Sequence, residues 1–154
     1  MKTYSRLTLA FLLLILVVPQ VGADDPPENG PHIEYHENGK KKLEANYKNG
    51  ERDGLSTEWH KNGQKSAEGH YKNGKRDGLL TRWHDNGRKR AEGHYKNGKA
   101  HGLSTWWYEN VQKEEEARYK DGELDGLLTR WDRNGKKLWE RHYKDGKVIS
   151  RKEF

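Results

Sequence analysis

The sequence predicts an all-β protein whose main part is one elongated single antiparallel sheet of tandem β-hairpin repeats, each 24 residues long. Three observations support this fold class. Aromatic residues recur at a strict spacing of 24 residues, as in repeat proteins. Between them, apolar and polar residues alternate with period two, which is the strand pattern. Asn-Gly and Asp-Gly pairs separate these segments, and such pairs are strong hairpin signals.

Two series of aromatic residues set the period. They are Tyr47, Tyr71, Tyr95, Tyr119 and Tyr143, and Tyr35, Trp59, Trp83, Trp107 and Trp131. Low apolar content does not indicate disorder in such a chain, because each repeat needs to bury only one stripe against its neighbours.

The first part of the chain differs from the repeats in composition. Two basic residues precede an apolar run over 7–18, and small residues lead up to Ala23. This order is typical of a secretory signal peptide. We therefore expect a signal peptide helix over 1–23, a mature chain that begins at Asp24, and export to the periplasm or the extracellular space.

Charge and length limit the remaining possibilities. The chain has 154 residues and no Cys, and without the first 23 residues it keeps 28 basic and 24 acidic residues, a net charge of +4. Such mixed charge indicates a solvated surface and does not favour nucleic acid as a partner. The length allows one domain. We place it at 33–154, after a flexible linker over 24–32.

The odd or even positions of the apolar residues predict the number of residues in each turn. These residues are odd-numbered in both strands of a hairpin, and a two-residue turn would put Tyr71 and Trp83 on opposite faces of the sheet. A three-residue x-Asn-Gly loop would keep them together. The sequence thus predicts three-residue loops, one aromatic face and one charged face.

One turn lacks its glycine. Val111 stands where the aligned turns have Gly, and a β-branched residue is disfavoured at positive φ. We expect the turn at Val111 to be remodelled.

The aromatic series form the candidate binding site. No second sheet or helix is predicted to cover them, so a partly exposed aromatic surface is expected, with Trp83 and Trp107 as its central contacts. The alternative role of the rings is stacking between hairpins to hold the sheet. The candidate residues are Tyr47, Trp59, Tyr71, Trp83, Tyr95, Trp107, Tyr119 and Trp131.

Recurring charged residues argue against catalysis. A catalytic carboxylate pair is needed once, whereas Glu recurs five times, each time three residues after a Lys, which predicts cross-strand salt bridges on the charged face. These residues are Glu44, Glu68, Glu92, Glu116 and Glu140. The histidines lack close metal-ligand spacing and no Cys accompanies them. We expect no enzymatic activity, no metal and no cofactor.

The unit resembles a known repeat. The segment Asn97-Gly98-Lys99-Ala100-His101-Gly102, with a Tyr-x-x-Gly-x-x-x-Gly pattern and a later aromatic residue in each full unit, is similar to the MORN (membrane occupation and recognition nexus) repeat, in its shorter bacterial variant. The resemblance covers about residues 33–147. It implies a β-hairpin solenoid used for protein or lipid contact, and part of the bacterial family is catalogued as toxin-antitoxin system antitoxin.

These observations predict a secreted, non-enzymatic module that binds another protein. An antitoxin or immunity role is the specific version that the resemblance implies. The alternative ligands are envelope lipid headgroups or cell-wall glycan, because aromatic rows suit sugar rings and basic residues suit phosphate. Self-association through the aromatic face is a further possibility.

Overall fold

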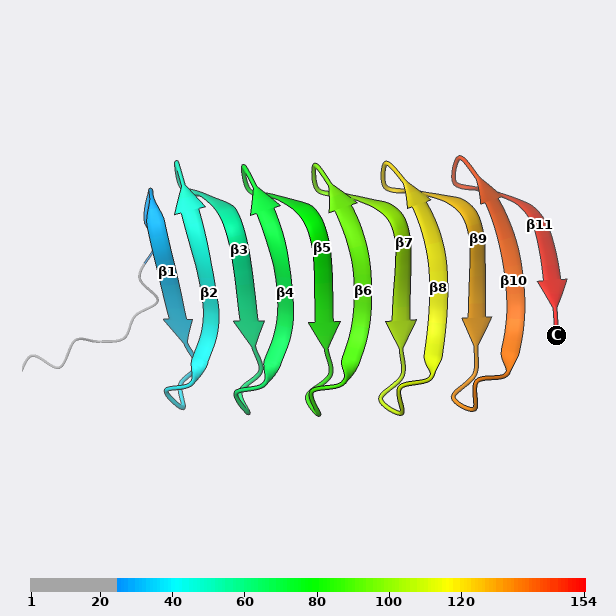
Figure 1. The fold of residues 1–154 in the computed structure, drawn as a ribbon, viewed down its shortest axis with the longest axis horizontal. Coiled ribbons are helices and arrows are strands. Elements are labelled where there is room, and N and C mark those ends of the chain that lie inside the picture. The colour runs from blue at the N-terminus through cyan, green and yellow to red at the C-terminus, as the bar shows by residue number, and fades with distance from the viewer. Residues whose placement is uncertain (1–24) are drawn as a thin grey trace, which may run out of the picture.

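The computed structural model describes residues 25–154 as one open antiparallel sheet whose 11 strands follow one another in chain order (Figure 1). The strands are β1 (Gly30–Tyr35), β2 (Lys41–Lys48), β3 (Glu51–Trp59), β4 (Lys65–Lys72), β5 (Lys75–Trp83), β6 (Lys89–Lys96), β7 (Lys99–Trp107), β8 (Lys113–Lys120), β9 (Glu123–Trp131), β10 (Lys137–Lys144) and β11 (Lys147–Glu153). The predicted single sheet of tandem hairpins is confirmed. The signal peptide helix predicted over 1–23 lies outside the described residues.

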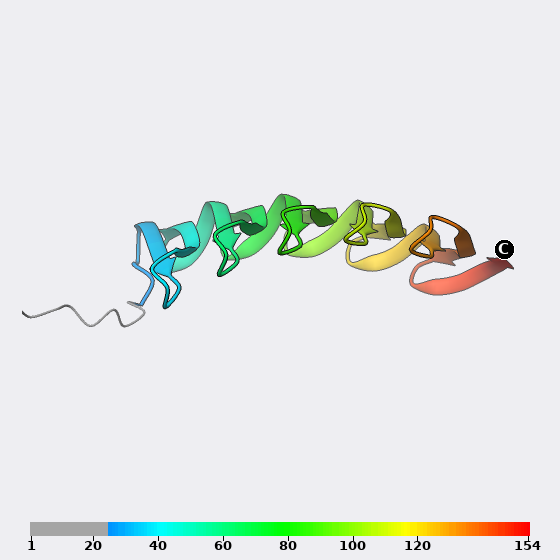
Figure 2. The ribbon, with the colours of Figure 1, turned by 90° about the horizontal axis from the view of Figure 1, so that it is seen from below.

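The sheet is a single layer. Figure 2 shows the strands side by side along the long axis, with no described element covering either side. β1 begins at Gly30, which pairs with Tyr47, so the sheet starts inside the segment 24–32 that the sequence assigned to a linker. The described residues form no helix that is long and apolar enough to cross a membrane.

The hairpins that join odd to even strands have three-residue loops. Between β5 and β6, the backbone N–H of His84 donates to the Arg88 carbonyl at 2.9 Å and that of Gly87 donates to the His84 carbonyl at 2.9 Å. Gly87 has φ 79°. This is a type I turn followed by a left-handed residue, as predicted, and all five such hairpins make the same two bonds.

The hairpins that join even to odd strands have two-residue turns instead. Lys72 pairs directly with Lys75, and the two residues between them, Asn73 and Gly74, have φ 47° and 70°. Two central residues with positive φ define the type I′ turn, which matches the right-handed twist of the flanking strands. The expectation of a three-residue loop between Tyr71 and Trp83 is therefore wrong.

Bulges decide which residues share a face. In β6 one extra residue, Arg90, lies between the pairs Arg82↔Ala91 and Trp83↔Lys89, and it reverses the parity that the three-residue loop had set. In β5 two extra residues follow the two-residue turn and leave the parity unchanged. Tyr71 and Trp83 consequently lie on opposite faces, and the predicted single aromatic face is wrong.

Each face therefore has its own aromatic series. The tryptophan face is defined here by Tyr35, Trp59, Trp83, Trp107 and Trp131 with the Lys, Glu, Thr and Leu residues of the same rows. The tyrosine face is defined by Tyr47, Tyr71, Tyr95, Tyr119 and Tyr143 together with the residues that lie on the same side of the sheet, among them Trp106.

The core consists of two rows through the middle of the sheet, one on each face. On the tyrosine face the buried row has mostly small side chains and includes Ala45, Ser56, Gly69, Leu80, Gly93, Ser104, Ala117 and Leu128. On the tryptophan face it contains Thr57, Thr81, Thr105 and Thr129, which are 4–8% exposed. Larger neighbours on both sides shield these rows, so a single layer can exclude water from its centre.

A glycine stands at the bulge of each of the strands β3, β5, β7 and β9. Gly78 has φ 117° and pairs with Tyr95 on the next strand. Only glycine adopts this backbone conformation without strain, and an aromatic ring opposite covers the backbone that glycine leaves bare. In Figure 1 the odd strands β3, β5, β7 and β9 bend near this position after leaving their hairpins.

The turn at Val111 is not remodelled. Val111 has φ 65°, its N–H donates to the Tyr108 carbonyl at 3.0 Å, and the Tyr108 N–H donates to the Gln112 carbonyl at 3.0 Å. These are the bonds of the glycine-containing turns, so the expectation from sequence was wrong. The repeat geometry holds a β-branched residue in the left-handed region, which is strained.

We predict that Val111→Gly raises the free energy of unfolding by about 1 kcal/mol, because it removes this strain without changing the turn. Val111 is 59% exposed, so little packing is lost. Urea denaturation followed by tryptophan fluorescence measures the effect. An unchanged or lower stability would show that the valine is not strained in solution.

Candidate functional site

Lysines on the tryptophan face make non-covalent contacts between successive hairpins. Lys65 Nζ lies 6.0 Å from the ring centroid of Trp83, in the next hairpin, and 2.5 Å from the Glu68 carboxylate. The same arrangement recurs at Lys41 over Trp59, Lys89 over Trp107 and Lys113 over Trp131, at 5.6–5.9 Å. Half-buried tryptophan rings and their lysine caps thus hold neighbouring repeats together.

The recurring glutamates take part in the same ladder. Glu92 pairs with Lys89 three residues earlier in its own strand, at 2.6 Å, so the predicted cross-strand pairing is wrong. Glu92 also faces Thr81 and Thr105 on the two adjoining strands. It therefore lies on the same face as Trp83, and not on a separate charged face.

An apolar row remains exposed on the tryptophan face. It consists of Leu55, Leu79, Leu103 and Leu127, which are 39–43% exposed. These residues alternate across the sheet with His70, His94, Arg118 and His142. The contacts within the sheet leave much of this leucine surface open to solvent.

Side chains also link the three-residue loops. His84 Nε2 donates to the Trp107 carbonyl at 2.9 Å, and Tyr108 OH donates to the Trp131 carbonyl at 3.0 Å, each reaching the next hairpin. His60 makes the equivalent bond. These histidines therefore have a structural role, and across residues 25–154 no group of three or more His, Asp or Glu side chains could hold a metal ion.

Arginines separate the first tyrosines of the tyrosine face. Arg76 Nε donates to Tyr71 OH at 3.4 Å, and its guanidinium carbon lies 5.5 Å from the centroid of the Tyr95 ring. Arg52 makes the same two contacts one repeat earlier. Ala100 takes the place of arginine opposite Tyr95, so this row becomes apolar in the second half of the sheet.

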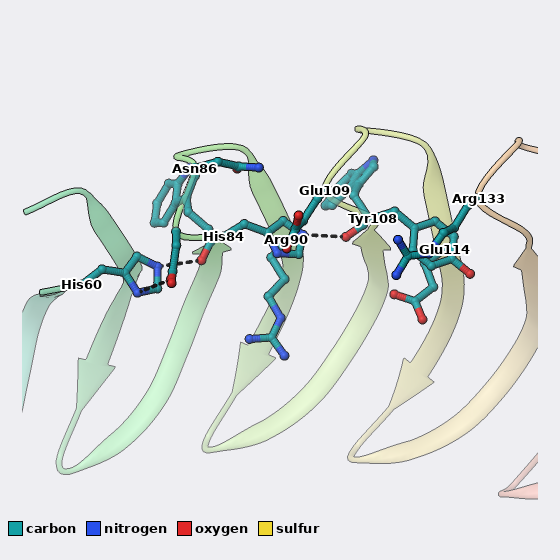
Figure 3. Close-up of a pocket in the computed structure, with 11 residues that line it drawn as sticks. His60, His84, Asn86, Arg90, Tyr108, Glu109, Glu114 and Arg133 are labelled. Carbon is teal, nitrogen blue, oxygen red and sulfur yellow. Dashed lines mark hydrogen bonds and ion pairs between the residues drawn. The ribbon is translucent and has the colours of Figure 1, made fainter. Parts of the chain in front are cut away.

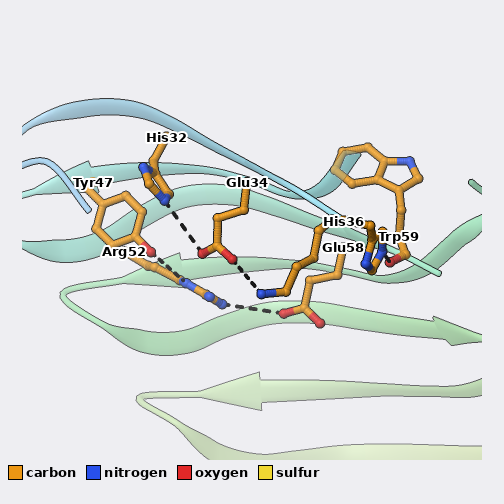
Figure 4. Close-up of polar contacts among 8 residues, drawn as sticks. His32, Glu34, His36, Tyr47, Arg52, Glu58 and Trp59 are labelled. Carbon is orange, nitrogen blue, oxygen red and sulfur yellow. Dashed lines mark hydrogen bonds and ion pairs between the residues drawn. The ribbon is translucent and has the colours of Figure 1, made fainter. Parts of the chain in front are cut away.

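Ion pairs cluster at the N-terminal end of the tyrosine face (Figure 4). Glu34 accepts from Lys42 at 2.7 Å and lies 3.6 Å from His32, while Arg52 lies 3.6 Å from Glu58. The hydrogen bond from Lys42 holds the pKa of Glu34 below its ordinary value. Each carboxylate here has a basic partner.

A second group of charges lies nearer the C-terminal end. Arg130 lies 3.3 Å from Glu114 and 3.8 Å from Glu115. Burial raises the pKa of Glu115 despite the opposing effect of Arg130. Beside them Trp106 packs edge-on against Tyr119, with ring centroids 6.5 Å apart.

An open groove of about 620 Å³ lies between these groups, near the loops that connect the strands from β5 to β8 (Figure 3). His84, Arg90, Tyr108, Glu114 and Arg133 are among its lining residues. The lining mixes both signs of charge, and within it His60 Nδ1 lies 2.9 Å from the Asp85 carboxylate.

The two faces differ in how strictly the repeat is kept. On the tryptophan face the Leu, Thr, Trp, Lys and Glu positions are identical in all four full repeats. On the tyrosine face, apart from the tyrosine and the bulge glycine that pairs with it, each position differs in at least one repeat. The position of Arg82, for example, carries Glu34, Glu58, Trp106 and Arg130 in the other hairpins.

The structure thus divides the predicted binding residues between two faces. Trp59, Trp83, Trp107 and Trp131 lie on one face, and Tyr47, Tyr71, Tyr95 and Tyr119 lie on the other. The sequence analysis did not identify Arg82 or Arg90 as candidate binding residues. It also did not place Trp106 on the same face as the tyrosines. The available signal was their departure from the repeat consensus, which identifies positions that the hairpin fold itself does not require.

Comparison with known proteins supports the repeat assignment. Residues 28–49, 52–73 and 76–97 match the family model described as MORN repeat variant. No curated protein matches the chain. The hairpins beyond residue 97 keep the strand registers of the matched ones. The chain thus contains three tandem segments that match the MORN repeat variant, within a sheet that continues the same architecture.

Proposed function

We propose that this protein is a non-enzymatic interaction module that binds another protein through its tyrosine face. One observation carries the proposal: within the strands, most of the variation between repeats falls on that face. Residues that make the same contact in every hairpin serve the repeat architecture. Residues that differ at equivalent positions create a surface without internal symmetry, which suits the irregular surface of a folded partner.

The residue types on this face agree with such a role. Trp, Tyr and Arg dominate the contacts that contribute most to protein binding, and this face presents all three around Arg82, Tyr95 and Trp106. They line a shallow depression at the centre of the sheet, with Gly93 among its lining residues. Binding energy concentrates at such central positions.

A pair of neighbouring residues tests the proposal. The exported protein is used to capture a partner from envelope extract, and the affinity of that partner is then measured for the unmodified protein and for the variants Trp106→Ala and Trp107→Ala. Trp106 lies on the tyrosine face and Trp107 on the tryptophan face. Loss of affinity at Trp106 alone supports the proposal, whereas loss only at Trp107 in a folded variant contradicts it.

The exposed leucine row favours a second candidate, an envelope lipid or cell-wall glycan bound on the tryptophan face. Leu and Lys recur there at every second strand, about 10 Å apart at ordinary strand spacing, which suits a repetitive ligand. Headgroup binding by these lysines weakens steeply as ionic strength rises, because salt screens exposed charges. Binding of a protein partner to desolvated aromatic rings is expected to persist at the same ionic strength.

We further propose that the protein acts outside the cytoplasm as an antitoxin-like or immunity-like binder. The N-terminal sequence pattern supports export, and the antitoxin-like role is what the resemblance to the bacterial repeat implies. Export places its target in the periplasm or the extracellular space.

Export makes a direct prediction. N-terminal sequencing of the purified exported protein is expected to begin at Asp24, because the small residues before it suit signal peptidase. A protein that begins at Met1 and stays in the membrane fraction would contradict export and leave the interaction proposal intact.

A further inference from the structure

Two arginines at the centre of the tyrosine face have no acidic partner. Arg82 on β5 pairs across the sheet with Ala91 on β6, directly after Arg90. Both arginines are exposed, and no carboxylate of residues 25–154 lies within 4.0 Å of either of them. Figure 3 shows Arg90 extending from the loop end toward the middle of the sheet, apart from Glu114.

The equivalent positions in the other hairpins are neutralised internally. Glu34 and Lys42 occupy them in the first hairpin and form an ion pair of 2.7 Å. Glu58 in the second hairpin has Arg52, and Glu114 in the fourth has Arg130. Only the central hairpin carries two like charges there, among the repeats that the structure describes.

An indole completes the group on the next strand. Trp106 on β7 pairs with the same Ala91 that pairs with Arg82. Arg82, Ala91 and Trp106 therefore form one row across β5, β6 and β7. That row spans about 10 Å at ordinary strand spacing. Tyr95 lines the same depression as Arg82 and Trp106.

We propose that Arg82, Arg90 and Trp106 form an acceptor site for an acidic segment of the partner protein that also carries an aromatic residue. The inference rests on the proposed function and specifies the chemistry of the partner. The planar guanidinium binds a carboxylate through two parallel hydrogen bonds, and two guanidinium groups from adjacent strands suit two neighbouring carboxylates. The indole and Tyr95 supply the adjacent apolar contact.

Synthetic peptides test the site without the natural partner. The purified protein is titrated with Ac-Asp-Glu-Phe-Glu-Asp-NH₂ and with its neutral analogue Ac-Asn-Gln-Phe-Gln-Asn-NH₂, and binding is followed by NMR. We expect the acidic peptide to shift the side-chain signals of Trp106, Arg82 and Arg90, and to bind at least about tenfold more tightly than the neutral one.

Variants that remove equal charge distinguish binding at this site from general electrostatic attraction to the protein. The double variant Arg82→Gln, Arg90→Ser is expected to lose at least about tenfold in affinity for the acidic peptide. Serine is already accepted at the equivalent Ser66, so the fold is expected to tolerate it. Lys72→Gln, Lys75→Gln removes the same charge from a turn and is expected to lose less than about twofold, since exposed charges are screened.

Equal losses in the two double variants would overturn the site, as would equal binding of the acidic and neutral peptides. Anionic phospholipid vesicles that bind more tightly than the acidic peptide through the same arginines would assign the site to a lipid surface instead, and also overturn it. With the captured partner, full binding by the arginine variant and loss in Trp106→Ala would refute this inference alone. Full binding by both would refute the proposed tyrosine-face interaction as well.

Discussion

Gly126→Ala is expected to lower the free energy of unfolding by about 2–3 kcal/mol, and Gly102→Ala by about 1–2 kcal/mol. Both glycines stand at bulges with positive φ, 120° and 91°, where an L-residue is strained. They differ in surroundings. A Cβ on Gly126 would lie 3.1 Å from the Arg118 Cβ, whereas a Cβ on Gly102 would meet nothing within 4 Å.

The pair of variants therefore separates two physical effects. Gly102→Ala measures the cost of the backbone conformation, and the additional loss in Gly126→Ala measures the steric contact with Arg118 on the neighbouring strand. Urea unfolding of both variants, followed by tryptophan fluorescence and by far-ultraviolet circular dichroism, gives the two values. No loss in either variant would show that these glycines are not held at positive φ in solution.

Trp106→Ala is expected to weaken binding of the captured partner by about 2 kcal/mol, close to thirtyfold, with a small effect on stability. The equivalent positions of β5 and β9 carry Arg82 and Arg130, so the hairpin fold does not require an indole there. The indole is lost, and with it the apolar contact at the centre of the tyrosine face.

Trp107→Ala is expected to have the opposite profile. The ring lies under Lys89, and tryptophan recurs at this position in four hairpins because it joins neighbouring repeats. Its removal is expected to cost about 2–3 kcal/mol of stability, somewhat less than for a fully buried ring. Affinity measured at a temperature where the variant remains folded is expected to change little. A reversed pattern, with binding lost at Trp107, would favour the tryptophan face and the glycan or lipid alternative.

The sequence by itself was sufficient for the repeat length, the strands and the positions of the turns. Asn-Gly and Asp-Gly pairs mark every hairpin except the one at Val111, because local backbone preferences decide where a chain reverses. The strict spacing of Tyr and Trp predicted one continuous sheet, since identical units without insertions stack on one another.

Only the tertiary structure decided which side chains share a face. That depends on the number of extra residues at each bulge, and bulges such as the one at Arg90 leave no mark in the alternation of polar and apolar residues. In a two-layer protein the buried face would have revealed the register. Here both faces of a single layer meet water, so apolar residues occur on each of them and the pattern does not distinguish the faces.

The same limit applies to the candidate site. The sequence shows that Arg82, Arg90 and Trp106 depart from the repeat, but their proximity follows from a register in which Ala91 pairs with both Arg82 and Trp106. The lysine caps on the tryptophan rings, 18 residues apart along the chain, also follow from that register. Hairpin formation is a local property of this sequence, whereas the pairing between hairpins that builds its surfaces is set by bulge geometry and long-range strand contacts.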